Sequence, residues 1–178
     1  MARKATAQRK PSTWQDRMYD MLREHGVDQF AYVPDAGHKI VINRCLDDPD
    51  AHAVALTTEE EGVALAAGAN LGDGRAVVLM QSSGVGNCVN FLSMLDGAQF
   101  PFLTIVSMRG EFGEGHPWQM SMGQAVEPVL ETMGINCLRI EREEDVEQTI
   151  QAALTMVFKS EQRVAVLLTQ RLLGAKAF

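Results

Sequence analysis

Short runs of apolar residues alternate along this chain with longer stretches of helical periodicity. The runs predict six strands, at about residues 29–33, 53–56, 76–80, 102–107, 136–140 and 164–168. Each run is apolar at nearly every position instead of at every second one, which is typical of strands buried on both faces of a parallel sheet.

The stretches between these runs have the spacing of amphipathic helices. The clearest covers about residues 143–158, where Val146 and Ile150 fall on one face and acidic residues fill the first turn. Ser12 or Thr13 can cap a helix over residues 12–25, which His25-Gly26 would end. The other helices are predicted at about residues 38–46, 59–70, 87–96 and 121–133.

Strands that alternate with helices predict an α/β fold. We expect one three-layer α/β/α domain over residues 12–178, with about six mostly parallel strands in a doubly wound, flavodoxin-like arrangement. A length of 178 residues suits one such domain. Residues 1–11 are basic and lack an apolar segment, so they are predicted to be a disordered leader and not a secretory signal.

Composition and charge argue against several classes of function. The chain carries 16 basic and 23 acidic residues, a net charge of −7, and has no basic stripe of the kind that binds nucleic acid. No apolar run approaches the roughly 20 residues needed to span a bilayer. Three widely spaced cysteines form neither a zinc pattern nor a disulfide framework. We therefore expect a cytoplasmic protein that binds neither nucleic acid nor membranes.

A cluster of three glutamates follows the second predicted strand. In open α/β sheets, ligands bind outside the carboxyl ends of the strands. Glu61 fits a capping box with Thr58, and acidic residues such as Glu60 complement the dipole of a helix that begins here. Capping explains Glu59 less well, so Glu59 is the candidate functional residue of the three.

The third predicted strand ends in the Ser/Gly-rich segment 82–87. Its backbone N–H groups could bind a phosphate at the start of a helix. The segment lacks the lysine of a P-loop and the full glycine spacing of a dinucleotide motif. The alternative is a tight strand-to-helix connection with no ligand.

Two further strand ends carry polar candidates. His38 follows the first predicted strand, and Arg109 and His116 lie in the long Gly-rich stretch from Met108 to about Met120. The three side chains could face one cleft, where an arginine and a histidine suit an anionic substrate. The alternative is that these loop charges are only solvated.

Five segments that follow one another along the chain carry a family resemblance. They are Val33-Pro34-Asp35, Glu59 with Gly68, Met80 to Asn87 with Asn90, Arg109-Gly110-Glu111, and Glu131 to Ile135. Together they resemble the pyrimidine-binding (PYR) half of thiamine diphosphate-dependent 2-oxo acid decarboxylases. The resemblance covers about residues 14–170 and is greatest to the decarboxylases of sulfopyruvate and phosphonopyruvate.

This resemblance implies a role for each candidate residue. Glu59 matches the family's invariant acid, so it would be the catalytic residue that hydrogen-bonds the aminopyrimidine ring of thiamine diphosphate and activates it. The residues implied to contact the pyrimidine end of the cofactor are Pro34, Ser83, Gly84 and Asn87. Those implied to contact an anionic 2-oxo acid are Asp35, His38, Arg109 and His116.

No segment of the chain resembles the diphosphate-binding (PP) half of these enzymes. The resemblance therefore implies no metal ligand in this chain, and a β subunit that binds Mg²⁺ and the diphosphate in an α2β2 or larger complex. Two alternatives stay open. One is a carboligase subunit that uses the same cofactor, and the other is a non-catalytic, flavodoxin-like protein that binds a nucleotide or phosphate on the Ser83–Asn87 segment.

Overall fold

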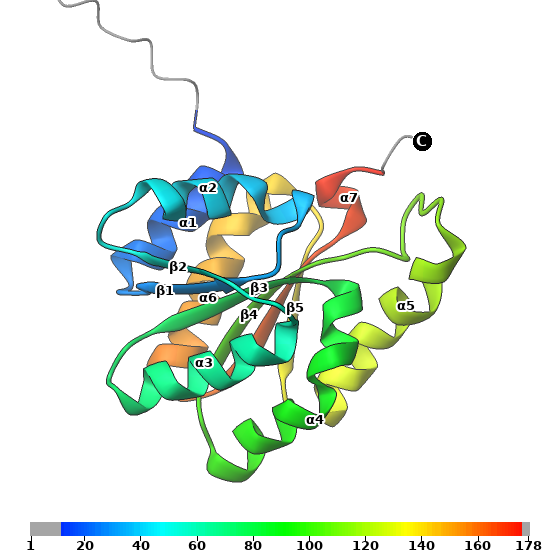
Figure 1. Ribbon diagram of the computed structural model, residues 1–178. Helices are drawn as coiled ribbons and strands as arrows, with labels where there is room; N and C mark the ends of the chain where they lie inside the picture. Colours follow the sequence, from blue (N-terminus) through cyan, green and yellow to red (C-terminus); the bar gives the residue numbers. More distant parts are fainter. Residues whose placement is uncertain (1–11, 176–178) are drawn as a thin grey trace, which may run out of the picture.

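A single parallel sheet forms the centre of the molecule. The computed structural model describes residues 12–175, in which six strands lie in the order β2-β1-β3-β4-β6-β5 (Figure 1). All five neighbouring pairs are parallel, which confirms the predicted fold class. The strands are β1 (Gln29–Tyr32), β2 (His52–Ala55), β3 (Ala76–Gln81), β4 (Phe102–Ser107), β5 (Asn136–Ile140) and β6 (Arg163–Leu168).

Helices cover both faces of the sheet. They are α1 (Trp14–Glu24), α2 (Lys39–Asp47), α3 (Glu59–Leu71), α4 (Ser82–Ala98), α5 (Pro117–Thr132), α6 (Val146–Phe158) and the short α7 (Gln170–Leu173). Two 3₁₀ turns, η1 (Ala36–His38) and η2 (Glu143–Asp145), precede α2 and α6. Helices α1, α2 and α6 pack on one face, and α3, α4 and α5 on the other. The result is the predicted three-layer sandwich.

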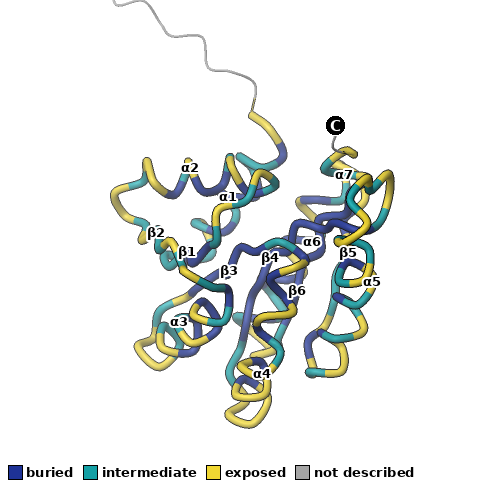
Figure 2. The backbone as a smooth tube through the Cα atoms, turned by 45° about the vertical axis from the view of Figure 1, so that its right-hand side comes forward, coloured by how far each residue is buried: buried dark blue, intermediate teal, exposed yellow. Residues whose placement is uncertain are grey.

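Successive strand residues divide the core into two halves. In β1, Phe30 packs with α1, α2 and α6, whereas its neighbour Ala31 packs with the helices of the opposite face. Val77 and Val78 of β3 divide in the same way. Figure 2 shows β3, β4 and β6 as buried tubes between more exposed helices. Both faces of the central strands β3, β4 and β6 are covered, which explains why their sequences are apolar at nearly every position.

The strand order reverses between β1 and β3. From β1 the chain crosses outward to β2 through α2, and it then returns through α3 to β3 on the other side of β1. Connections that leave neighbouring strands in opposite directions open a crevice at the carboxyl ends of those strands. The fold therefore brings the residues that follow β1 and β3 to one ligand-binding edge.

Helix boundaries depart from the prediction more than strand boundaries do. α4 begins at Ser82 and not near residue 87, so the Ser/Gly-rich segment is the first turn of a helix. α5 begins at Pro117, ahead of the predicted start near residue 121, and the sequence pattern does not predict α7. Glycine and serine have low helix propensity, so periodicity alone places the start of α4 too late.

The N-terminal helix begins at one of its two predicted caps. The hydroxyl oxygen of Thr13 accepts a hydrogen bond from the backbone N–H of Asp16, whose carboxylate accepts one from the N–H of Thr13. His25 ends the helix, as predicted. The leader predicted at residues 1–11 lies outside the described residues. Among the helices of residues 12–175, none combines the length and apolar character needed to cross a bilayer.

Candidate active site

Glu59 is the first residue of α3, and its side chain turns into the protein. The residue is 8% exposed, and Oε2 of its carboxylate accepts a hydrogen bond of 2.8 Å from Nδ2 of Asn87 in the second turn of α4. The two helices pack side by side on the same face of the sheet. The structure therefore brings together two residues that were predicted to share a site.

Gly84 provides the space that the Glu59 carboxylate occupies. A Cβ atom at position 84 would lie 2.5 Å from Cγ and Cδ of Glu59, well inside van der Waals contact. The other carboxylate oxygen of Glu59, Oε1, makes no hydrogen bond within residues 12–175. The result is a buried carboxylate with one oxygen fixed and the other available as an acceptor.

The two neighbouring glutamates accept hydrogen bonds from nearby threonines. Oε2 of Glu61 accepts a hydrogen bond of 2.8 Å from the N–H of Thr57, and Oε2 of Glu60 accepts one of 2.6 Å from the hydroxyl of Thr58. The predicted capping box between Thr58 and Glu61 is therefore wrong, because Thr58 makes no side-chain cap and Glu61 reaches one residue further back. Of the three glutamates, Glu59 alone is buried.

Two other predicted cofactor contacts lie at the surface. Ser83 is exposed in the first turn of α4, and its hydroxyl donates a hydrogen bond of 2.7 Å to Oε1 of Gln81. Pro34 is exposed after β1 and borders a shallow pocket with Lys39 and Ile42. Their contact with a cofactor stays a prediction.

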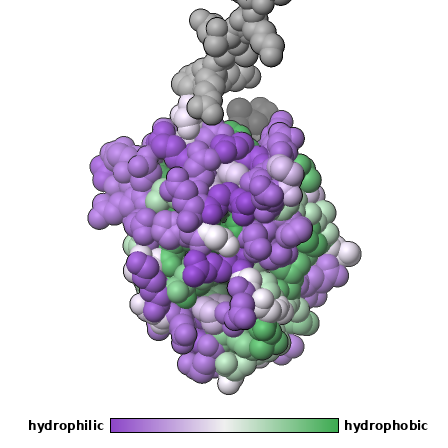
Figure 3. Space-filling model, turned by 90° about the vertical axis from the view of Figure 1, so that its left-hand side faces the viewer, coloured by the Kyte–Doolittle hydropathy of each residue, from purple (hydrophilic) through white to green (hydrophobic). Residues whose placement is uncertain are grey.

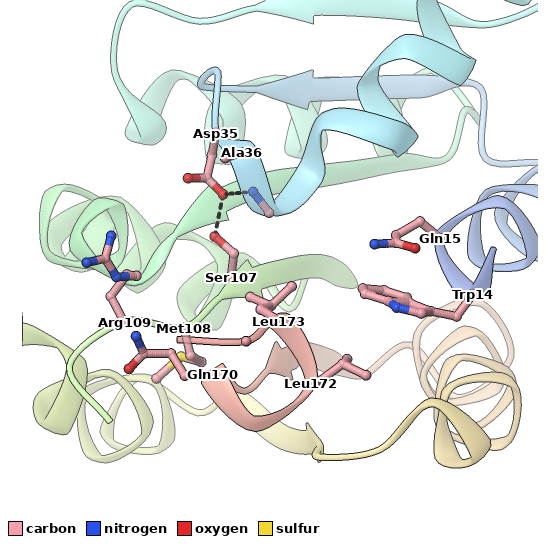
Figure 4. Close-up of a pocket in the computed structure, with 12 residues that line it drawn as sticks. Trp14, Gln15, Asp35, Ala36, Ser107, Met108, Arg109, Gln170, Leu172 and Leu173 are labelled. Carbon is pink, nitrogen blue, oxygen red and sulfur yellow. Dashed lines mark hydrogen bonds between the residues drawn. The ribbon is translucent and has the colours of Figure 1, made fainter. Parts of the chain in front are cut away.

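A cavity of about 320 Å³ lies at the carboxyl ends of β1 and β4 (Figure 4). Its walls come from the segment after β1, from the end of β4, and from α7 and α1. Oδ2 of Asp35 accepts hydrogen bonds from the N–H of Gly37, at 2.8 Å, and from the hydroxyl of Ser107, at 2.7 Å. These contacts fix one oxygen of a carboxylate that borders the cavity.

Arg109 also borders this cavity, but its charge is already paired. Its Nε and Nη2 donate hydrogen bonds of 2.6 Å each to the two carboxylate oxygens of Glu114. The Arg109 guanidinium, with the N–H groups of His116 and Gly110, holds the pKa of the Glu114 carboxyl far below its usual range. The hydrogen bonds to Glu114 in turn raise the pKa of Arg109. Arg109 does not present a free guanidinium to a substrate.

The two predicted histidines occupy very different positions. His38 is fully buried at the end of η1, and its Nε2 lies 3.1 Å from the carbonyl oxygen of Met80. Burial lowers the pKa of His38, so its ring is neutral. His116 stacks on Trp118 with ring centroids 4.3 Å apart. Neither histidine lines the cavity, so their contact with a substrate stays a prediction.

The Glu59 site and the cavity are connected through the start of α4. The buried hydroxyl oxygen of Ser82 accepts a hydrogen bond of 3.1 Å from the N–H of Arg109. Sequence reasoning missed Ser107, Glu114 and Gln170. Nothing in the local sequence indicates that Ser107 bonds Asp35 or that Gln170 bonds Glu114. No cluster of three or more metal-ligating side chains is present in the part of the chain that the structure describes.

Comparison with known proteins places the chain in a family. The family model described as "Thiamine pyrophosphate enzyme, N-terminal TPP binding domain" matches residues 12–135, more than half of the chain. The chain therefore belongs to the thiamine pyrophosphate enzymes and carries their N-terminal TPP binding domain. This membership confirms the resemblance carried by the five sequence segments.

Two of the relatives that the chain matches are named decarboxylases. The chain is 34% identical over 154 residues to sulfopyruvate decarboxylase subunit alpha of Methanococcus maripaludis, a match that covers 86% of this chain and 92% of that relative. It is 38% identical over 108 residues to phosphonopyruvate decarboxylase of Streptomyces viridochromogenes, covering 60% of this chain and 27% of that relative. In three dimensions it resembles a 2-oxoglutarate:ferredoxin oxidoreductase from Magnetococcus marinus, with a TM-score of 0.73 and 19% identity over 90% of this chain and 29% of that one.

Proposed function

We propose that this chain is the pyrimidine-binding α subunit of a thiamine diphosphate-dependent decarboxylase. Its substrate would be an anionic 2-oxo acid of the sulfopyruvate or phosphonopyruvate type. The observation that carries the proposal is the buried carboxylate of Glu59, with Oε2 held by Asn87 and space beside it left by Gly84. Family membership supports the cofactor, and the names of two relatives support the reaction and the kind of acid.

The residues around Glu59 fit the aminopyrimidine ring of this cofactor. Oε1 of Glu59 would accept a hydrogen bond from a ring nitrogen, while Asn87 keeps the carboxylate from turning away. Gly84 leaves the carboxylate its place beside α4. When bound, thiamine diphosphate supplies the electron sink that stabilises the charge left by departing CO₂. Pro34 and Ser83 complete the proposed set of pyrimidine contacts.

A nearly uncharged helix, α4, packs beside Glu59 and supports a partner subunit. Asp96 is the single charged residue in the 17 residues of α4. Phe91 and Met94 on this helix are each 38% exposed, and Leu71 at the end of α3 is 73% exposed. The face turned to the viewer in Figure 3 is mainly hydrophilic, and hydrophobic surface gathers toward its lower right edge. Apolar surface of this kind marks interaction sites.

We assign this α3–α4 surface to a β subunit that binds the diphosphate and Mg²⁺, in an α2β2 or larger complex. The relative of matching length is named a subunit, whereas the phosphonopyruvate enzyme is a longer chain of which the match covers 27%. That difference in length supports a catalytic unit divided here between two chains. Because Glu59 contacts Asn87 of α4, a partner seated on α4 would complete the active site.

The cavity between β1 and β4 is the proposed place of the 2-oxo acid. Its volume of about 320 Å³ suits a small acid, and Asp35 and Arg109 border it. Neither histidine lines the cavity. His38 would therefore affect the acid only by positioning η1, and His116 only by positioning the loop after Arg109. The three cysteines of the described chain are free thiols, which supports a cytoplasmic enzyme.

Substitution of Glu59 tests the proposal. In the complex reconstituted with its β subunit, Glu59→Gln is expected to lower the rate of CO₂ release by about 100-fold or more, since the amide is a far weaker proton acceptor. The matched control is Glu60→Gln, which changes the adjacent residue on the same helix, whose carboxylate accepts a hydrogen bond from Thr58. Circular dichroism verifies that both variants fold. Full turnover by E59Q would eliminate the proposed role.

A further inference from the structure

The carboxylate of Glu114 is bound as a small anionic ligand would be. It accepts hydrogen bonds of 2.6 Å from Nε and from Nη2 of Arg109, 3.1 Å from the N–H of Gly110, 2.9 Å from the N–H of His116 and 3.1 Å from Nε2 of Gln170. The Glu114 side chain is 1% exposed. A guanidinium fork with two backbone N–H groups and an amide is a complete set of donors for an oxyanion.

Glycines flank the segment that carries Glu114. Gly110 and Gly113 have positive φ angles of 74° and 68°, and a third glycine, Gly115, follows Glu114. Phe112, Gly113 and Gly115 are exposed, so the carboxylate of Glu114 is the buried anchor of residues 112–115. Glycine hinges let such a segment leave and return without rearranging the core.

The donors that hold Glu114 also face the cavity. Arg109 and Gln170 belong both to the set around Glu114 and to the cavity wall, and Figure 4 shows them at the end away from Trp14. A ligand in the cavity therefore competes with Glu114 for the same two side chains. With Glu114 in place, Asp35 leaves this region net negative. Once Glu114 moves out to solvent, the charges of Asp35 and Arg109 balance, and an anion can enter.

We propose that Arg109, Gly110 and Gln170 form an oxyanion site that Glu114 occupies as an internal ligand, and that the carboxylate or sulfonate group of a small acid displaces it. Exchange of one oxyanion for another leaves the guanidinium paired both before and after, so neither state leaves a buried charge alone. The identity of this acid as the 2-oxo acid substrate rests on the proposed function. The existence of the oxyanion site rests only on the contacts of Glu114.

The test measures binding of methanesulfonate to the full-length chain, without cofactor, partner or turnover. Glu114→Ala is expected to bind methanesulfonate at least tenfold more tightly than the wild-type chain, with the amide signals of Gly110 and Arg109 shifting in the NMR titration. The matched control is Glu111→Ala, which removes the same charge from the same loop but leaves the Arg109 donors occupied. Neutral dimethyl sulfone, similar in shape, is expected not to bind.

Equal affinity of E114A and E111A for methanesulfonate, or equal binding of dimethyl sulfone, would overturn the proposal. If E114A folds poorly, Glu114→Gln takes its place, and the melting temperature is measured instead, because a ligand of the native state raises it. If methanesulfonate raises the melting temperature of E114Q no more than that of E111A, the proposal is also overturned. Since no turnover is measured, an inactive or an active E59Q complex leaves this result unchanged, and the two proposals fail separately.

Discussion

Nδ2 of Asn87 donates a 2.8 Å hydrogen bond to Oε2 of Glu59, although the two residues lie 28 positions apart in the sequence. The contact exists because α3, which follows β2, and α4, which follows β3, pack side by side on one face of the sheet. It holds one carboxylate oxygen and leaves the other open. The orientation of the proposed catalytic acid therefore depends on a residue of another helix.

Removal of this hydrogen bond should reduce activity without affecting the fold. Asn87→Ala is expected to lower the free energy of unfolding by roughly 1 kcal/mol, the contribution of one hydrogen bond, so the variant stays folded. The same loss lets the Glu59 carboxylate turn, and a loss of about 1.4 kcal/mol of transition-state stabilisation lowers a rate tenfold. We therefore expect CO₂ release by the reconstituted complex to fall about tenfold or more. Asn90→Ala, three positions later on α4, is the control, and equal activity of the two variants would argue against a role for Asn87.

A methyl group at position 84 should displace the catalytic acid. The Cβ of Gly84→Ala would lie 2.5 Å from Cγ and Cδ of Glu59, so the carboxylate must leave its position. We expect a loss of activity close to that of Glu59→Gln. Gly97→Ala is the matched control on the same helix, because a Cβ there meets nothing within 4 Å.

Gly97→Ala should keep the activity that Gly84→Ala loses. Alanine at an open helical position typically stabilises by about 0.5–1 kcal/mol, so Gly97→Ala should raise the free energy of unfolding and keep full activity. Urea unfolding and CO₂ release measure both effects. An active Gly84→Ala enzyme would mean that Glu59 works from a position other than the one observed.

The sequence predicts the sheet well because burial on both faces leaves a strong pattern. Phe102 to Ser107, buried at every position, is predicted with its observed bounds. Asn136 to Ile140 is also predicted with its observed bounds, although this edge strand is only partly buried. The start of α4 is predicted five residues late, because the serine and glycine residues there resemble a turn. Those same small residues make room for Glu59, so the local pattern is weakest where the site is built.

Candidate site residues were harder to interpret, since their contacts are long-range. The pairing of Arg109 with Glu114 requires the loop to fold back on itself, and Gln170 joins it from 56 positions beyond Glu114. His38 follows a strand, as an active-site residue would, yet it is fully buried against the carbonyl of Met80. Spacing along the chain indicates the edge of the sheet on which residues lie, and it does not indicate which of them pair.

A charge on the α3–α4 surface should weaken assembly with a β subunit. Phe91 is 38% exposed on α4, and burial of an aromatic side chain in an interface commonly contributes about 2 kcal/mol or more. Phe91→Asp is therefore expected to weaken the complex at least about tenfold, as measured by size-exclusion chromatography with light scattering, while the isolated chain stays folded. Leu46→Asp is the control, because Leu46 is 59% exposed on α2, which packs on the opposite face of the sheet. A stable F91D complex would place the interface elsewhere.

Glu114 should make the stability of the fold sensitive to acid. Its pKa in the folded chain is held far below the usual range by Arg109, whereas a glutamate in an unfolded chain titrates near about 4.3. A lowered pKa stabilises the folded state at pH values above the unfolded pKa, and this contribution is lost as the pH falls below it. Breaking a buried ion pair costs roughly 3–5 kcal/mol. Glu114→Gln should therefore unfold at lower urea concentration than wild type at pH 7.

The difference in free energy of unfolding between wild type and E114Q should become smaller as the pH falls below about 4. Protonation of Glu114 then removes from wild type the ion-pair contribution that the variant already lacks. Urea unfolding at intervals between pH 7 and pH 3 measures it. Glu144→Gln is the control: the Glu144 side chain is 68% exposed and pairs with an equally exposed Arg142, so its removal should cost less than about 0.5 kcal/mol at every pH. Parallel curves for wild type and E114Q over this range would mean that the Arg109–Glu114 pair does not contribute to acid unfolding.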